Sequence, residues 1–320
     1  MRRLLIAAAF GLALPAAASA ADCGEVTLTE MNWASSAVVS HVSKFLMEQG
    51  YGCKVKLIPS STVPALASVA ETGKPDIVTE LWINGAPSYN ELQAAGKIET
   101  LTDVLSDGGV EGWWIPTYLV KAHPELASIE GVLANPGLLE NRFHNCPEGW
   151  GCLRTNTALS QAFDLKGNGF EIFQHGSGET MATSIAAAYE SKKPWFGYYW
   201  APTSVLGKYD MTSVDLGPYD EKIHACNSKP GCEEVGKSSY PVGPVKTIVT
   251  TEFSTKHPEI SALMKNVSFT NAQMGALLSW QEEKKASAEE VAVHFLSTSP
   301  DVWKGWINEE AAGKLSALLK

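Results

Sequence analysis

The sequence has only one long apolar run, and that run is too short to cross a membrane. It extends from Leu4 to about Leu14, whereas a spanning helix needs about 20 apolar residues. Two arginines precede it and small residues follow it, so residues 1–20 are typical of a secretory signal peptide. We therefore expect an exported, soluble protein. A lipid anchor at Cys23 is the weaker alternative, because Asp22 stands where lipoprotein signals carry a small uncharged residue.

Basic residues are also scarce. The chain has 25 lysines and arginines against 35 aspartates and glutamates. Removal of residues 1–20 takes away Arg2 and Arg3 and no acid, which leaves a net charge of about −12. A surface of this sign repels phosphate groups, so nucleic acid and anionic membranes are not expected partners. The mature chain is too long for one comfortable hydrophobic core, which favours two lobes.

The six cysteines lack the spacing and the neighbours of a zinc site. Neither local pair has the C-x2-C spacing, and no histidine pair stands nearby. An even number of cysteines in an exported chain instead indicates disulfides. Short separation favours two local pairs, and the other two cysteines each precede a strand-like run, where parallel neighbouring strands would bring them together. The predicted disulfides are Cys23–Cys53, Cys146–Cys152 and Cys226–Cys232.

Motifs for catalysis, metals or cofactors are also missing or stand in unsuitable contexts. Gly231–Ser238 matches the phosphate-binding pattern G-x4-G-K-[ST], but polar, proline-containing segments flank it where a strand and a helix are needed. The stretch His175-Gly-Ser-Gly-Glu179 suggests a nucleophilic serine, but His175 replaces the first glycine of G-x-S-x-G. A turn that caps a helix beginning at Glu179 is favoured there. We expect no cofactor and no metal site.

The order of elements predicts an α/β fold. Early strand-like runs are 26–31, 54–58 and 76–81. They alternate with helical periodicity, which favours mostly parallel sheets with helices on both faces. The pattern resumes after about residue 120, so we expect lobe one to comprise residues 22–115 plus 245–320. Residues 116–244 are expected to be inserted as lobe two, and the two chain crossings between the lobes would form a hinge.

Tryptophan, by contrast, is abundant, with ten residues. Three in the helical C-terminal part have spacings that suit packing, namely Trp280, Trp303 and Trp306. Three others end strand-like runs, namely Trp33, Trp82 and Trp200. Ligands of doubly wound sheets lie beyond the carboxyl ends of the strands, where these three fall. Trp113 and Trp114 lie near a predicted crossing, and Trp150 lies in the loop NCPEGWGC between two cysteines.

Several indoles that converge on one cleft can hold a methylated cation through its attraction to the aromatic faces. Each contact contributes about 0.5 to 2 kcal/mol, so four rings would give roughly 2 to 8 kcal/mol. Micromolar affinity needs about 8 kcal/mol. Burial of the methyl groups would supply the remainder. The alternative is that these tryptophans are ordinary core residues.

At these residues the chain resembles the periplasmic binding proteins of ABC importers for quaternary ammonium compounds. The similarity runs from about Glu25 to Trp306. The motifs that carry it are Cys146-Pro-Glu-Gly-Trp150-Gly-Cys152, Tyr198-Tyr-Trp200-Ala-Pro, Glu80-Leu-Trp82 and Asn32-Trp33. The resemblance implies a type II periplasmic binding protein fold, a small methylated ligand, a membrane permease as partner, and a periplasmic location. A monomer is expected.

The resemblance also implies roles for single residues. Trp82, Trp150 and Trp200 would be cage walls, and Trp33 and Trp113 would complete the box. The loop disulfide would hold the Trp150 ring against the methyl groups. The amides of Gly151 and Cys152 would face the anionic end of the ligand, since glycine lets the backbone approach closely.

One position departs from the family pattern. Some betaine-binding members place a side-chain donor for the carboxylate four residues beyond the Trp82 position, where this chain has Ala86. Glu111 and Trp113 share one face of an extended segment, and a glutamate beside the box would repel a carboxylate. It would accept a hydrogen bond from the choline hydroxyl or from a protonated N-oxide. We therefore expect choline or trimethylamine N-oxide to be preferred over glycine betaine.

Two other functions compete with a transport receptor. An exported enzyme acting on a small amine could use His175, Ser177 or Glu179, and it would change its ligand during incubation, whereas a receptor returns it unchanged. A sensory or adhesive ectodomain would need an anchor or a partner domain, and we expect neither in this chain.

Overall fold

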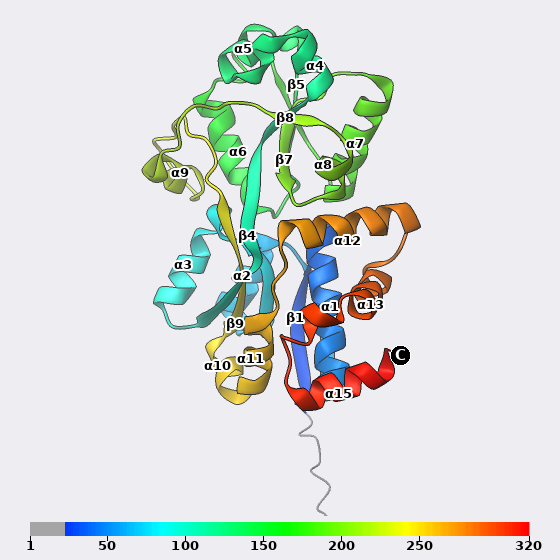
Figure 1. The fold of residues 1–320 in the computed structure, drawn as a ribbon. Coiled ribbons are helices and arrows are strands. Elements are labelled where there is room, and N and C mark those ends of the chain that lie inside the picture. Colours follow the sequence, from blue (N-terminus) through cyan, green and yellow to red (C-terminus); the bar gives the residue numbers. More distant parts are fainter. Residues whose placement is uncertain (1–22, 320) are drawn as a thin grey trace, which may run out of the picture.

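The computed structural model describes residues 23–319 and shows two lobes stacked end to end (Figure 1). The long strand β4 (Ile98–Pro116) and the chain leading into β9 (Gly243–Thr250) join the lobes. The predicted signal peptide lies outside the described residues. None of the helices between residues 23 and 319 combines the length and apolarity that a bilayer crossing needs.

Lobe one is built on the strand order β2-β1-β3-β9-β4. Strand β1 (Glu25–Met31) pairs in parallel with β2 (Lys54–Ser60) and β3 (Ile77–Trp82). Strand β9 is antiparallel to β3 and to the first part of β4. The helical elements of this lobe are α1 (Ala34–Tyr51), α2 (Thr62–Thr72), η1 (Ile83–Gly85), α3 (Pro87–Ala94), α10 (Thr251–Lys256), α11 (Pro258–Asn266), α12 (Asn271–Lys284), α13 (Ala288–Thr298), α14 (Pro300–Trp303) and α15 (Glu309–Leu318).

Lobe two continues the sheet through β4-β7-β5-β6, with β8 (Met211–Ser213) also paired to β4. Strand β5 (Arg142–Asn145) is parallel to β6 (Glu171–Gln174) and β7 (Gly197–Ala201), and the second part of β4 is antiparallel to β7. The helical elements of this lobe are α4 (Thr117–Ala122), η2 (Pro124–Ala127), α5 (Ile129–Ala134), η3 (Pro136–Leu139), α6 (Gly151–Ala162), α7 (Gly178–Ser191), α8 (Ser204–Lys208) and α9 (Glu221–Asn227).

Helix α1 illustrates how the local sequence specifies these elements. Val38, Val42 and Leu46 recur at intervals of four residues, as one helix face requires, and all three are fully buried. The helix ends at Gly52, whose φ of 73° lies in the left-handed region that glycine adopts without strain. Its buried face packs against β1 and α13, which fixes the carboxyl end of β1 relative to the rest of lobe one.

Strand β4 belongs to both lobes. It pairs with β9 as far as Gly109, opposite Gly243, and with β7 from Val110, opposite Ala201. The outgoing and returning chains therefore cross between the lobes side by side. The lobe boundaries at residues 115 and 245 stay predictions, because one continuous strand serves both sheets.

The predicted two-lobed α/β class is confirmed, but neither sheet is mostly parallel. Parallel pairs involve β1 with β2 and β3, and β5 with β6 and β7, whereas β4 and β9 form antiparallel pairs. The reason is the insertion of lobe two. A chain that leaves one lobe along β4 and returns along β9 must run in opposite directions in the two crossings.

The cysteines and the C-terminal tryptophans lie as predicted. All three disulfides form, namely Cys23–Cys53, Cys146–Cys152 and Cys226–Cys232. Trp303 and Trp306 are buried in the core of lobe one. Trp280 is half-buried and stacks on His294, with ring centroids 3.9 Å apart.

Candidate ligand-binding site

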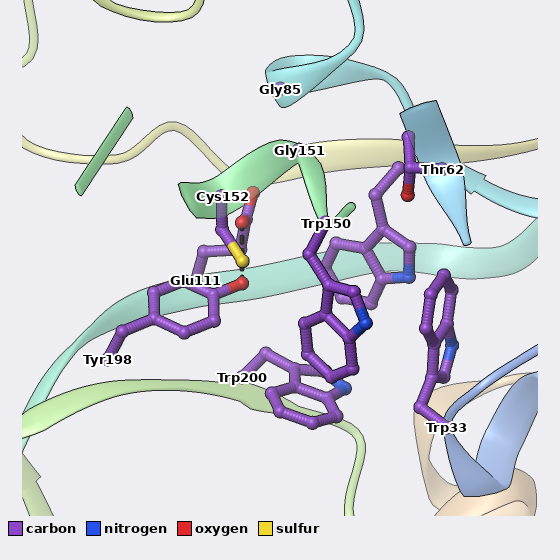
Figure 2. A pocket seen from close by; sticks show the side chains of 10 residues that line it. Trp33, Thr62, Gly85, Glu111, Trp150, Gly151, Cys152, Tyr198 and Trp200 are labelled. Carbon is purple, nitrogen blue, oxygen red and sulfur yellow. Dashed lines mark hydrogen bonds between the residues drawn. The ribbon is translucent and has the colours of Figure 1, made fainter. Parts of the chain in front are cut away.

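A pocket lies between the lobes, where β1, β3 and β7 end (Figure 2). It contains about 350 Å³ not occupied by protein atoms, part of which is open to solvent. The lining residues are Trp33, Thr62, Trp82, Gly85, Glu111, Trp150, Gly151, Cys152, Tyr198 and Trp200. The pocket thus brings together every predicted ligand-binding residue except Trp113.

Three of the indoles form adjacent walls (Figure 2). The ring centroids of Trp33 and Trp150 lie 5.2 Å apart with planes at 71°, and those of Trp150 and Trp200 lie 5.0 Å apart at 80°. Rings in near-perpendicular edge contact form the corners of a box rather than a stack. Trp33 follows β1 in lobe one, whereas Trp150 and Trp200 belong to lobe two, so both lobes are needed to build the walls.

The disulfide loop carries Trp150 to lobe one. Cys146 and Cys152 are bridged, and helix α6 begins at Gly151, so Trp150 is the last residue before the helix. Its indole Nε1–H donates to Asn32 Oδ1 at 2.7 Å, and the carbonyl of Gly149 accepts from the amide of Val63 at 3.0 Å. The loop and its ring are therefore held covalently in lobe two and by hydrogen bonds to lobe one.

Glycine permits the backbones of the two lobes to touch beside this ring. A Cβ atom placed on Gly85 would lie 2.6 Å from the carbonyl carbon of Gly151, and a Cβ atom on Gly151 would lie 2.7 Å from the Gly85 oxygen. Neither position has room for a side chain. A similar restriction holds at the crossing, where a Cβ atom on Gly109 would lie 2.1 Å from Cζ3 of Trp82.

Glu80 is fully buried behind the indoles of Trp33 and Trp82. Its Oε1 accepts hydrogen bonds from Trp33 Nε1 at 2.6 Å, from Ser35 Oγ at 2.6 Å and from Trp82 Nε1 at 3.4 Å. Burial raises the pKa of the Glu80 carboxyl to about 7, although these three hydrogen bonds oppose the shift. The residue therefore orients two indoles of lobe one and titrates near neutral pH.

The other end of the pocket is polar. Glu111 is half-buried, and its Oε1 accepts a hydrogen bond from the hydroxyl of Tyr198 at 2.7 Å (Figure 2). Burial raises the pKa of Glu111, and burial together with the nearby Glu111 raises that of Tyr198 well above its usual range. The first turn of α6, with Gly151 and Cys152, lies beside them and directs the positive end of the helix dipole toward the pocket.

Trp113 corrects the predicted site. Its side chain is fully buried in lobe two against Phe143, Phe163 and Phe196, and its Nε1–H donates to Asn156 Oδ1 at 2.8 Å. Trp113 shares a strand face with Glu111, but its ring packs into this phenylalanine cluster and does not line the pocket. Trp114 does not line the pocket either, and its Nε1–H donates to the carbonyl of Tyr199 at 3.0 Å.

Two of the three residues considered for catalysis, Ser177 and His175, make local contacts. Ser177 is the N-cap of α7, and its Oγ accepts from the amide of Thr180 at 3.2 Å, which agrees with the predicted capping turn. The Nε2 atom of His175 lies 2.9 Å from Nδ1 of His144. Burial lowers the pKa of His175 to about 4. In the described part of the chain, the Ser177 and His175 side chains therefore bond to Thr180 and His144, and not to each other.

Sequence reasoning missed four residues of the site, namely Thr62, Glu80, Gly85 and Tyr198. Tyr198 could have been found, because it lies two residues before Trp200 on one strand and therefore shares its face. No local signal marks Thr62 or Gly85, since each reaches the pocket only through the contact between lobes. Glu80 lies two residues before Trp82 in one of the motifs that carry the resemblance. The direction of its side chain, however, depends on a backbone irregularity in β3.

Comparison with known proteins assigns the chain to a family. The sequence model of the family described as the substrate-binding domain of ABC-type glycine betaine transport systems matches residues 24–298. The chain belongs to this family. Its members are transport binding proteins that work in the periplasm or outside the cell, so the predicted class, a substrate-binding protein of an ABC importer, is confirmed.

Several known proteins are similar to this chain over most of its length. The trimethylamine N-oxide-binding protein of Pelagibacter ubique is 23% identical over 295 residues, which are 87% of this chain and 89% of the relative. A choline-binding protein solved with choline has a TM-score of 0.75 and 17% identity, covering 93% of this chain and 99% of its own. The lactococcal protein OpuAC, solved with glycine betaine, has a TM-score of 0.71 and 20% identity, covering 89% and 100%.

Proposed function

We propose that this protein captures a small methylated ammonium compound between its lobes and delivers it to the permease of an ABC importer. The observation that carries the proposal is the box of near-perpendicular indoles from both lobes around one pocket. Trimethylammonium groups bind such faces through cation–π attraction. The names of the relatives, which bind trimethylamine N-oxide, choline and glycine betaine, support this chemical class. The protein acts as a periplasmic monomer with no chemistry of its own.

Within this class the polar end favours choline or trimethylamine N-oxide over glycine betaine. A hydroxyl can donate to Glu111 while it accepts from an amide of the α6 N-terminus. The oxygen of a protonated N-oxide can likewise donate to Glu111 and accept from the amide. An ionised Glu111 would repel the carboxylate of betaine, and Ala86 supplies no side-chain donor to offset this repulsion.

Ligand capture couples to closure of the lobes. Trp150 donates to Asn32 across the cleft, Gly85 meets Gly151, and Lys208 pairs with Glu282 at 2.7 Å between α8 and α12. A ligand held by indoles of both lobes stabilises these contacts together. The closed form then offers the permease a surface that the open form lacks.

Calorimetric titration of the purified protein with choline, trimethylamine N-oxide and glycine betaine tests the proposal. We expect choline or the N-oxide to bind with micromolar or tighter affinity and betaine at least tenfold more weakly. The ligand should be recovered unchanged after incubation, as magnetic resonance of the recovered compound would establish. Tightest binding of betaine would overturn the preference, and binding of none of the three would overturn the proposed class of ligand.

A further inference from the structure

Glu80 is held in an unusual conformation by strand β3. Its φ of 50° lies in the left-handed region, which residues other than glycine rarely adopt. The register between β3 and β9 shifts between Val78 and Leu81, as in a β-bulge. Bulges re-aim side chains, and strained backbone persists where the surrounding structure holds it for function. The result is a carboxylate placed behind the cage instead of in its wall.

The groups around Glu80 do not neutralise its charge. Its three hydrogen-bond donors, the indoles of Trp33 and Trp82 and the hydroxyl of Ser35, are all neutral. Its Oε2 is buried and has no partner among residues 23–319. Two basic side chains on neighbouring elements contact other acids instead. Lys246 on the adjacent strand β9 pairs with Asp103 at 2.7 Å, and His41 on α1 lies 3.2 Å from Glu30.

A buried carboxylate without a cation is unfavourable, because it loses hydration without gaining an opposite charge. A cation in the pocket would supply that charge across the two indoles. The hydrogen bonds add to the effect, since donation of an indole N–H to a carboxylate polarises the ring and makes its face more negative. The arrangement therefore stabilises a cation in the pocket more than a neutral molecule of the same shape.

We propose that Glu80 is a positioning residue that acts as the counter-charge of the bound cation through Trp33 and Trp82, and that it makes the site selective for charge. The inference rests on the proposed function. It adds a second source of selectivity, a buried negative charge, to the aromatic box. The aromatic walls recognise the shape and the methyl groups. Glu80 recognises the positive charge.

The test compares choline with 3,3-dimethylbutan-1-ol, in which carbon replaces the charged nitrogen, by calorimetric titration at pH 8. We expect Glu80→Gln, which keeps the accepting oxygen and removes the charge, to weaken choline binding about tenfold and binding of the neutral alcohol less than twofold. Glu91→Gln is the matched control, because Glu91 is an exposed acid on α3 of the same lobe. It should change neither affinity by more than twofold.

A second variant keeps the proposal falsifiable if Glu80→Gln does not fold. Glu80→Asp retains the charge and should keep the ratio of choline to alcohol affinity within threefold of the wild-type ratio, even if both affinities fall. Equal losses for both ligands in Glu80→Gln, or loss of the ratio in Glu80→Asp, would reduce Glu80 to a structural support for the rings. If wild-type protein binds neither ligand, the proposed function fails instead.

Discussion

The two lobes hold their indoles by different means. In lobe one, Trp33 and Trp82 share a buried carboxylate as hydrogen-bond acceptor. In lobe two, Trp150 is fixed by a disulfide loop, and Trp200 lies on a strand paired to β4. Lobe one therefore combines its rings with a charge that is costly to bury, whereas lobe two combines its rings with covalent and backbone rigidity. The difference suggests that lobe one supplies charge selectivity and lobe two supplies a rigid surface.

The largest expected effect concerns the stability of lobe one. The pKa of Glu80 rises from 4.5 to about 7 on folding. The folded state thus binds this proton more tightly, and stability falls as pH rises from 4.5 to about 7. At 1.36 kcal/mol per unit of pKa, the loss is about 3 kcal/mol. Glu80→Gln should lack this loss, so between pH 5 and 8 its free energy of unfolding should rise relative to wild type by about that amount.

Urea unfolding of the ligand-free proteins at both pH values would measure this difference. Glu91→Gln should follow wild type. If Glu80→Gln and wild type change equally with pH, Glu80 does not carry a buried charge, and the contrast between the lobes is lost.

The next effect concerns the ring that touches both lobes. Trp150→Ala should cost about 2 to 3 kcal/mol of choline binding, because Trp150 contacts Trp33 and Trp200 and bonds to Asn32. Trp82→Ala and Trp200→Ala should each cost about 1 to 3 kcal/mol. Calorimetry measures each loss, with Trp280→Ala as the control on α12. A loss at Trp280 as large as that at Trp150 would indicate general destabilisation.

A smaller effect is expected where the backbones of the lobes meet. Gly151→Ala would place a methyl group 2.7 Å from the Gly85 oxygen, so the lobes must separate slightly. We expect choline affinity to fall about tenfold, or 1.4 kcal/mol, and small-angle scattering to show a larger radius of gyration with saturating choline. Gly137→Ala is the control, since no atom of a residue beyond its chain neighbours lies within 4 Å of its added Cβ. If Gly151→Ala keeps the wild-type affinity and radius of gyration, the lobes can close without the contact between Gly85 and Gly151.

The smallest effect on affinity is expected inside lobe two. Trp113→Phe removes an indole that packs in the core and leaves Asn156 Oδ1 without that donor. Stability should fall by about 1 to 2 kcal/mol, whereas choline affinity should stay within twofold of wild type. Thermal unfolding and calorimetry measure the two quantities separately. A loss of choline affinity in a fully folded variant would show that Trp113 contributes to ligand binding.

Much of the fold and most of the site could be predicted from local patterns. The apolar spacing of Val38, Val42 and Leu46 indicates the buried face of α1, and the short cysteine separations indicate two of the disulfides. Trp33 and Trp82 could be assigned because each stands at the end of a strand-like run. These features can be predicted because periodicity, chain reversal and strand ends depend on residues that are close in the sequence.

The sequence by itself determined the alternation of strands and helices, the disulfide pairs and the tryptophans available for a cage. Only the tertiary structure decided that Trp113 is core, that Glu80 turns behind Trp33, and that Gly85 meets Gly151. The physical reason is that each of these outcomes depends on where distant segments lie. A strand face leads into a pocket or into a core according to what the other elements place against it, and residues i and i+2 look alike in both cases.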